Sequence, residues 1–500
     1  MRRLVVTVSA ALLAAAGLPA VAQAQADPLR DQAITWGACT DLDVPVLECA
    51  TFTAPRDWRA PRDGKTITIA ISRLKARSGQ AKASVLTNPG GPGGPGRTLP
   101  ALYQDRAKLV QDHDIIGIDP RGTGASTNVT CGGFDFLTLT DPRDRSRENV
   151  DLLYDSAELQ ATACQVKSGE FGKVVNTEQT VKDLDLLRHL LGRDKISWIG
   201  YSGGTWMGAY YATYFPNRVD KFVLDSNTEF TTTFQEIFDE FGRGFQRRFD
   251  VDFLPWVAKY DSLYHLGTTA EQVRAAYEKT RARLAADPIP LPDGRLLDGV
   301  LLDLVLVQAQ YSKWAFADAA ALLSQLNAEQ KTLAALDVRY PDAPNATLYG
   351  IACNDTRFRG GREFLDREAR ELGAKYPLVG YYQILAPCAF WNRPPLQLKT
   401  PTGKGVPPIL MVQSVRDPAT PLEGAQRAHD RFAGSRMITV ADEGDHGIYG
   451  FGNACVNDLV ESFIVDGKVP PRDTTCPGEP LPDPTAMPAS KKPSLAHGWL

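Results

Sequence analysis

Residues 196–206 read Ile-Ser-Trp-Ile-Gly-Tyr-Ser-Gly-Gly-Thr-Trp, and this stretch constrains the fold more strongly than any other in the 500-residue chain. It combines a buried strand, a Gly-x-Ser-x-Gly turn and the start of a helix. Gly200 and Gly204 leave room where strand and helix nearly touch, and Ser202 takes a strained backbone position between them. The same pattern also occurs as an ordinary turn in Gly-rich chains. Ser202 is therefore a candidate nucleophile, and the rest of the sequence must show whether a base and an acid accompany it.

Strand and helix patterns alternate on both sides of this turn. Strand patterns occupy residues 66–71, 84–87, 114–119 and 222–224, and helical spacing of apolar residues occupies 177–191 and 205–215. This rhythm is typical of a mostly parallel sheet with helices on both faces. We therefore predict an α/β fold.

The alternation stops at about residue 226. As far as residue 406 no comparable strand appears, while 235–249, 270–286 and 301–326 read as helices. Sheet patterns resume at 408–412 and 437–440, so the helical block is expected to cap one edge of the sheet and not to form a separate domain. The predicted organisation is a core of residues 27–225 and 407–476, a mainly helical cap of residues 226–406, and a mobile Pro- and Ser-rich tail of residues 477–500.

The N-terminus has the layout of a secretory signal peptide. Arg2 and Arg3 precede an apolar run over residues 4–21, and small residues with Ala-x-Ala spacing follow. We expect residues 1–26 to be the signal, cleaved between about residues 22 and 26. A membrane anchor is the alternative, but the run is short, rich in Ala and broken by Gly17 and Pro19. Secretion, with no membrane association after cleavage, is the prediction.

Eight cysteines, an even number, fit an oxidising compartment. The sequence alone leaves their connectivity open, but they fall along the chain as neighbours. The local pairing that we favour is Cys39 with Cys49, Cys131 with Cys164, Cys353 with Cys388, and Cys455 with Cys476. Zinc is the competing interpretation, and no Cys-x-x-Cys or His-x-x-x-His run supports it, so we expect no metal and no cofactor.

Composition excludes some functions. The formal net charge is −4 and the charged fraction is 23%, so the chain has no electrostatic footprint for nucleic acid or an anionic membrane. We expect neither as a partner.

A serine hydroxyl needs a base within hydrogen-bond reach and a carboxylate that orients the base. On an α/β-hydrolase sheet the order is Ser, acid, His, each just past a strand end. The strand at 409–412 runs into a loop that contains Asp417. The alternative role of Asp417 is to form an Asx-type turn before Pro418. The last strand leads to His446, whereas the other five histidines lie before a strand, on helix patterns or in the tail. Ser202, Asp417 and His446 are the predicted triad.

A second loop can stabilise the oxyanion. Residues 88–96 read Asn-Pro-Gly-Gly-Pro-Gly-Gly-Pro-Gly directly after a strand. A linker is the simple interpretation, but a backbone without side chains can point an N–H at a carbonyl oxygen here. We expect the N–H of Gly203 and an N–H near Gly91 to form the oxyanion hole.

These residues resemble the secreted tripeptidyl aminopeptidases of streptomycetes, relatives of the proline iminopeptidases in the α/β-hydrolase superfamily. The resemblance covers most of the mature chain and rests on Asn88-Pro89-Gly90-Gly91-Pro92-Gly93, Asp119-Pro120-Arg121-Gly122-Thr123-Gly124, Gly200-Tyr201-Ser202-Gly203-Gly204-Thr205, Cys353-Asn354-Asp355 and the closing Cys455 and Cys476. It implies the α/β-hydrolase fold with a cap, the same triad, and a last disulfide between Cys455 and Cys476. The chain departs from the family at Gly203-Gly204 and at Asp445 before His446, which leaves substrate preference open.

The resemblance implies an exopeptidase that releases short peptides, tripeptides above all, from the free N-termini of peptides or proteins. We expect a monomer. Such an enzyme needs a carboxylate for the α-ammonium group and a cap that blocks longer entry. Glu229 and Asp355 are the candidates, with ordinary salt bridging as the alternative for each.

Three other functions are alternatives for this sequence. A secreted carboxylesterase or lipase would use the same triad, and is the main alternative. A non-catalytic binding protein has no need of all three triad residues. An Asp-nucleophile hydrolase does not fit a serine at the turn.

Overall fold

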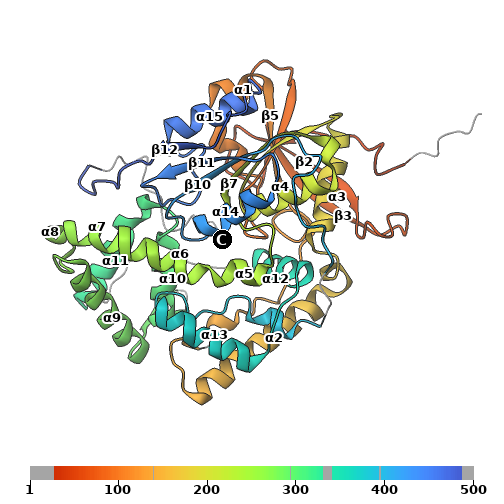
Figure 1. Ribbon diagram of the computed structural model, residues 1–500. Helices are drawn as coiled ribbons and strands as arrows, with labels where there is room; N and C mark the ends of the chain where they lie inside the picture. The colour runs from red at the N-terminus through yellow and green to blue at the C-terminus, as the bar shows by residue number, and fades with distance from the viewer. Residues whose placement is uncertain (1–26, 139, 293, 330–340, 393–395, 487–500) are drawn as a thin grey trace, which may run out of the picture.

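The computed structural model describes residues 27–138, 140–292, 294–329, 341–392 and 396–486. The predicted signal peptide and residues 487–500 of the predicted tail lie outside this range. Ten strands form the central sheet (Figure 1). Along the chain they are β1 (Gly37–Ala38), β2 (Glu48–Pro55), β3 (Thr66–Leu74), β4 (Ala83–Asn88), β5 (His113–Asp119), β6 (Ile196–Ser202), β7 (Val219–Asn227), β10 (Leu410–Ser414), β11 (Arg436–Ala441) and β12 (Thr474–Pro477).

The strands lie in the order β1-β2-β3-β5-β4-β6-β7-β10-β11-β12. From β5 to β12 all neighbours are parallel, whereas β1, β2 and β3 pair antiparallel. The prediction of a mostly parallel sheet is confirmed. Because β6, β10 and β11 are parallel, their carboxyl ends meet at one edge, where open α/β sheets bind ligands.

Side chains of β6 alternate between two apolar cores, one on each face of the sheet. Trp198 packs in the core that includes α3 (Thr177–Leu190), α4 (Gly203–Tyr214) and α14 (Leu422–Arg431). Ile199 packs in the core that includes α1 (Ala107–Asp112) and α15 (Ala454–Ile464). The period of two is that of a strand buried on both faces, so helices cover both sides as predicted.

A helical cap follows β7, and Figure 1 shows it below the sheet. Residues 245–326 supply most of an apolar core of its own, whereas buried side chains at 346–353, 365 and 385–388 pack in the core that contains Trp198. Its elements are α5 (Phe234–Asp239), α6 (Phe241–Arg248), η4 (Phe249–Phe253), α7 (Leu254–Lys259), α8 (Asp261–Tyr264), α9 (Ala270–Ala286), β8 (Ile289–Pro290), β9 (Leu296–Leu297), α10 (Gly299–Ala309), η5 (Lys313–Ala315), α11 (Phe316–Asn327), α12 (Asp342–Asp355), α13 (Arg362–Lys375) and η6 (Ala386–Phe390). The predicted helix at 270–286 is α9. The predicted helix at 301–326 is instead broken at residues 310–312 into α10 and α11.

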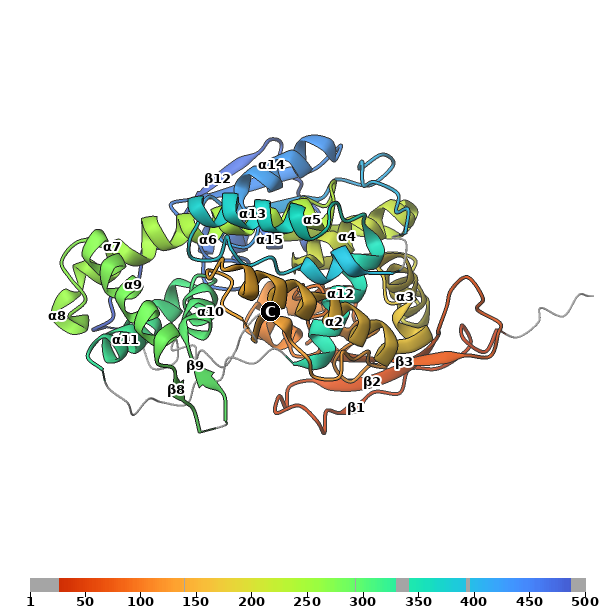
Figure 2. The same cartoon turned by 90° about the horizontal axis from the view of Figure 1, so that it is seen from below.

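One helix before β6 contacts the cap as well as the core. Helix α2 (Arg147–Gly172) runs beside α12 and α13 in both views (Figures 1 and 2). Arg362 of α13 forms ion pairs with Asp155 and Glu158 of α2. Helix α2 thus contacts the cap through ion pairs, while its buried side chains Leu153, Tyr154 and Ala157 pack in the core that contains Trp198.

The chain after β12 is packed as far as the structure describes it. The indole N–H of Trp256 in the cap donates to the carbonyl of Pro482 over 2.8 Å, and Lys313 Nζ donates to the carbonyl of Glu479 over 3.0 Å. Predicting a mobile tail from residue 477 is wrong for this stretch, because its backbone carbonyls bind the cap.

Four disulfides link the cysteines as neighbours along the chain, as the sequence analysis paired them. They are Cys39–Cys49, Cys131–Cys164, Cys353–Cys388 and Cys455–Cys476. Cys353–Cys388 joins α12 to η6, and Cys455–Cys476 joins α15 to β12. Within the described ranges, no helix is both long and apolar enough to cross a bilayer.

Candidate active site

Ser202 is at the junction of β6 and α4, with φ 54° and ψ −125°. This left-handed backbone is costly for a residue other than glycine, and such strain collects at functional turns. Glycine is required on both sides of Ser202, because neighbouring backbone atoms lie too close for a side chain. A Cβ on Gly200 would lie 2.3 Å from the carbonyl oxygen of Gly204, and one on Gly204 would lie 2.7 Å from that of Asn88. The turn therefore has the geometry of a nucleophile elbow.

His446 and Asp417 meet over the ends of β11 and β10. Nδ1 of His446 lies 2.9 Å from Oδ1 and 3.0 Å from Oδ2 of Asp417. The Asp417 side chain is fully buried, and its Oδ1 accepts the N–H groups of Ala419 at 3.0 Å and Thr420 at 2.8 Å. Asp417 is thus fixed from its own loop and presents a carboxylate to one ring nitrogen, which leaves Nε2 for another partner.

The strand next to the elbow anchors the residues that follow His446. Ser226 accepts the N–H of Gly447 at 2.7 Å, and Oδ2 of Asp225 accepts those of Ile448 at 3.0 Å and Tyr449 at 2.7 Å. Burial raises the pKa of Asp225 to about 7, against these two hydrogen bonds. Because Ser202 pairs with Asn227 of the same strand, β7 ties the His446 loop to the elbow.

The cap also contacts His446 directly. The carbonyl of Tyr311 accepts the backbone N–H of His446 at 2.9 Å. The Tyr311 ring meets the imidazole edge to face, with centroids 5.2 Å apart at 88°. Tyr311 lies in the break between α10 and α11, so the interruption of that helix brings the cap onto the histidine.

A buried ionic network joins the cap to Asp445, the residue before His446. Oδ1 of Asp445 accepts from Nη2 of Arg248 at 2.5 Å and from the N–H of Lys313 at 2.7 Å. Lys313 Nζ donates to Oε2 of Glu443 at 2.5 Å. Burial raises the pKa of Asp445 to about 6, against the attraction of Arg248. Asp445 is thus one attachment point of the cap, next to His446.

The glycine-rich loop lies against the elbow. A Cβ on Gly203 would lie 3.2 Å from the backbone N of Gly91, and one on Gly90 would lie 2.6 Å from the backbone N of Gly203. Asn88 Oδ1 accepts the N–H of Gly90 at 2.9 Å, whereas the N–H of Gly91 has no acceptor in the part of the chain that the structure describes. Gly203 opens α4, where a helix leaves its first N–H groups without intrahelical partners.

The motif around Asp119 holds the far end of this loop. Oδ1 of Asp119 accepts the N–H groups of Gly96 at 2.8 Å and Arg97 at 3.1 Å, and its Oδ2 pairs with Nε of Arg97 at 2.9 Å. Arg121 is fully buried and pairs with Asp183 of α3 at 2.7 Å. The motif therefore acts on the loop and its supporting helix.

A cavity of about 900 Å³, called the main pocket here, opens beside these residues. Gly91 and Tyr311 line it together with apolar side chains of α5, α6 and α10, among them Phe245 and Leu304. The pocket therefore contacts the glycine-rich loop and the tyrosine on His446, and its size suits a ligand of a few residues.

The structure gives both predicted amine-binding carboxylates other partners. Glu229 forms ion pairs with Arg427 at 2.7 Å and Arg431 at 3.0 Å, and only 8% of the residue is exposed. Asp355 accepts the N–H of Thr177 at 2.9 Å and is buried under α3, where burial raises its pKa to about 7. Neither residue lines the main pocket. The amine-binding role proposed for them is not supported.

Several residues of the site carry no signal in the sequence. Tyr311 is inside an apolar helical pattern, and Asp225 and Ser226 read only as the end of a strand. Arg248 and Lys313 look like surface charges of helices, yet both side chains are almost fully buried. Only Lys313 gives an indication of burial in the sequence, because it is a charged residue within an apolar helical stretch.

Comparison with known proteins gives relatives along most of the chain. A family described as TAP-like protein matches residues 376–476. A tripeptidyl aminopeptidase of Streptomyces lividans is 33% identical over 481 residues, covering 90% of this chain and 88% of that protein. Serine protease Hip1 of Mycobacterium tuberculosis is 27% identical, covering 90% of this chain and 92% of its own. Carboxylesterase B of the same species is 26% identical, covering 92% of each.

Proposed function

The chain belongs to the tripeptidyl aminopeptidase family of α/β-hydrolases, and we propose that it is a serine exopeptidase releasing short peptides, tripeptides above all, from free N-termini. The observation that carries the proposal is the pairing of His446 with Asp417 at 2.9 Å, at the sheet edge where the strained Ser202 also lies. Order along the chain, strand-end placement and burial of the acid all fit a Ser-His-Asp triad.

In this mechanism Nε2 of His446 accepts the proton of Ser202 as Oγ attacks the scissile carbonyl carbon. The C–N bond then breaks, the leaving amine takes the proton from His446, and the N-terminal peptide stays as an ester on Ser202. Water, deprotonated by His446, attacks that ester and restores the serine. Asp417 keeps the proton on Nδ1 and stabilises the imidazolium that forms.

The N–H groups of Gly91 and Gly203 are proposed to stabilise the oxyanion. Both backbones border the main pocket or the elbow, and a donor fixed before the reaction needs no reorganisation when the charge develops. The substrate residues on the N-terminal side of the scissile bond would occupy the main pocket, whose apolar walls remove water from the ester intermediate.

Export of the enzyme is also a proposal. Four disulfides fit an oxidising compartment, as does the signal-like leader at residues 1–26. Peptides or protein N-termini outside the cell would be the substrates, and the enzyme would act as a monomer.

Three substrates and one variant test the function. They are a tripeptide p-nitroanilide with a free amine, its N-acetylated twin and a p-nitrophenyl ester, each assayed with wild type and Ser202→Ala. Cleavage of the free peptide, lost in Ser202→Ala with an unchanged melting temperature, is expected. Equal cleavage of the acetylated twin would contradict exopeptidase action, and full activity of the variant would contradict the nucleophile.

A carboxylesterase is the second candidate. The apolar lining of the main pocket favours it, and one relative carries that name. The ester substrate separates the two, because an esterase would turn over the ester and leave both anilides intact.

A further inference from the structure

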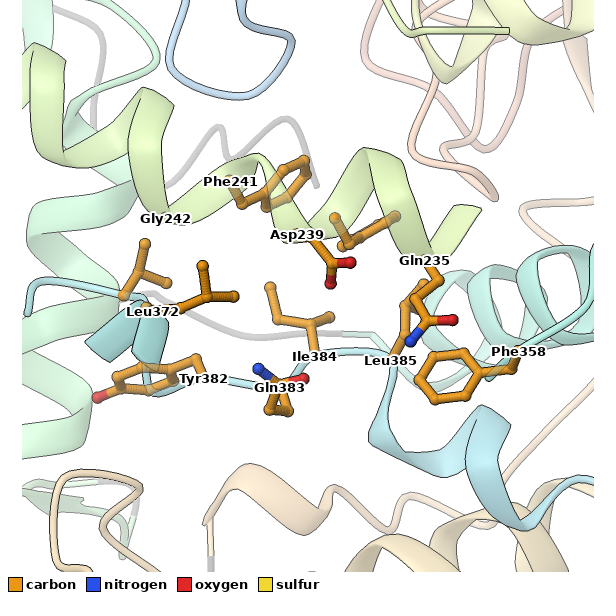
Figure 3. A pocket seen from close by; sticks show the side chains of 13 residues that line it. Gln235, Asp239, Phe241, Gly242, Phe358, Leu372, Tyr382, Gln383, Ile384 and Leu385 are labelled. Atoms are coloured by element: carbon orange, nitrogen blue, oxygen red, sulfur yellow. The ribbon is translucent and has the colours of Figure 1, made fainter. Parts of the chain in front are cut away.

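A second, smaller cavity of about 400 Å³ adjoins the main pocket, and Figure 3 shows it from close by. We call it the side pocket. It is formed by α5, the start of α6, α13 and residues 379–385. The two pockets share the side chains of Phe238, Phe241, Val379, Tyr382 and Ile384. The main pocket therefore touches both the glycine-rich loop and the side pocket.

Asp239, the last residue of α5, is the one carboxylate among the described residues that line the side pocket. Figure 3 shows its side chain directed into the cavity, above Ile384. In the described part of the chain no hydrogen bond or ion pair engages this carboxylate. Nearby carboxylates differ in this respect, since Glu236 pairs with Arg359 at 3.1 Å and Glu240 with Arg243 at 3.1 Å.

A second acid from another element lies close to Asp239. Oε2 of Glu368 on α13 is buried and has no hydrogen-bond partner within the described residues. Burial, and then the negative charge of Glu368, raise the pKa of Asp239 to about 7. Asp239 lines the cavity, and Glu368 lies beside it without lining it. The positive charge of Arg359 acts on both carboxylates but forms no ion pair with either among the described residues, so a bound ammonium group would recover free energy lost by their burial.

We propose that the side pocket binds the α-ammonium group of the substrate, with Asp239 as its carboxylate partner and Glu368 as a second negative charge. This inference rests on the proposed exopeptidase function and assigns the substrate's free N-terminus to a place. The peptide then runs from the side pocket through the main pocket to Ser202. The negative charge of the side pocket thus selects substrates with a free N-terminus, and Ser202 cleaves them at the other end of the two pockets.

The structure disfavours the other acids. Glu229 and Asp355 have their own partners and line neither pocket. Asp135 lines the main pocket, but its Oδ1 accepts the N–H of Leu137 at 3.1 Å. Asp239 is the acid that combines a place in a cavity with an unengaged carboxylate.

The test compares Asp239→Asn with Glu236→Gln, which removes the same charge from the same helix at a residue paired with Arg359. The substrates are the free tripeptide anilide, its N-acetylated twin and the p-nitrophenyl ester. Asp239→Asn is expected to lower kcat/KM for the free anilide by at least about 10-fold, mainly through KM, with ester turnover unchanged. Glu236→Gln should change none of them. A preserved preference for the free amine, or an equal loss on the ester, would overturn the assignment.

An inhibition experiment tests the ammonium site independently of peptidase activity. Ester hydrolysis is measured with added free tripeptide or its N-acetylated form as inhibitor. Stronger inhibition by the free form in wild type, abolished in Asp239→Asn, supports the ammonium site even if no anilide is cleaved. Equal inhibition by both forms in wild type overturns it. Failure of the peptidase function would instead appear as intact anilides in the wild-type assay.

Discussion

Arg248 of the cap helix α6 donates a 2.5 Å hydrogen bond to the carboxylate of Asp445, the residue before His446. The guanidinium is completely buried and also pairs with Asp252 at 2.5 Å, while its plane lies over Phe316. A cap that only covered the pocket would need no such contact. The loop that contains His446 is thus tied to a charge that the cap supplies.

Replacing this arginine should therefore damage both stability and turnover. Arg248→Met leaves Asp445 and Asp252 buried with fewer positive partners, and we expect the free energy of unfolding to fall by about 3 kcal/mol or more. Urea unfolding and ester turnover measure the two effects. Arg370→Gln is the control, because Arg370 is 52% exposed and its pair with Asp366 is worth at most about 1 kcal/mol. Equal losses in both variants would contradict the prediction.

Asp417→Asn should reduce turnover far more than stability. An amide cannot hold the Nδ1 proton of His446 in the same way, and kcat should fall on the order of 10⁴-fold, as in other Ser-His-Asp triads. The control is Asp442→Asn, at a side chain that is 97% exposed with φ 55°, a backbone that asparagine tolerates. Steady-state kinetics with the ester distinguishes them, and near-normal kcat in Asp417→Asn would exclude Asp417 as the acid.

Gly90→Ala should be poorly tolerated. Its Cβ would lie 2.5 Å from the carbonyl oxygen of Tyr201 and 2.8 Å from Cβ of Ser202, at φ 105°. We expect a loss of about 3 kcal/mol in the free energy of unfolding, together with lost activity. Gly79→Ala separates strain from contact, since Gly79 has φ 76° with nothing within 4 Å. That variant should lose only about 1 kcal/mol and keep its activity. Comparable losses by thermal unfolding would show that the elbow contact does not matter.

Asp225→Asn should change how stability depends on pH. Because burial raises the pKa of Asp225 to about 7 from 3.8, the folded state holds a proton between these values that the unfolded state has lost. Wild type therefore loses stability from this group as pH rises from about 4 to 7, whereas the amide does not ionise. The variant should gain relative to wild type between pH 4.5 and pH 8 in urea unfolding.

Asp220→Asn, at a more exposed position of the same strand, serves as the control for this measurement. Its difference from wild type should stay nearly constant over the same pH range. A constant difference for Asp225→Asn as well would contradict the raised pKa.

The elbow and the sheet around it were predictable because their signals are local. Strand periodicity, the glycines of the turn and the loops after β10 and β11 each depend on a few consecutive residues. Two parallel strands then bring His446 to Asp417 without any further information.

The cap was predictable as helical, but its contacts were not. Tyr311 contacts His446 only because α10 ends at Ala309, and α2 forms ion pairs with a residue of α13 that follows some 200 positions later. Asp239 reads as an ordinary surface acid until α13 and residues 379–385 close around it. Pairings of this kind depend on tertiary packing and leave no periodic trace in the sequence.

The hydrogen bonds from Trp256 and Lys313 to the carbonyls of Pro482 and Glu479 also have a consequence in time. A ribosome makes these two donors long before their acceptors, so the two hydrogen bonds form only after β10, β11 and β12 have been synthesised. Nascent chains that stop at residue 470 would contain Ser202, Asp417 and His446 without these two contacts. Attachment of the cap to the segment after β12 is therefore a late event in the synthesis of the chain.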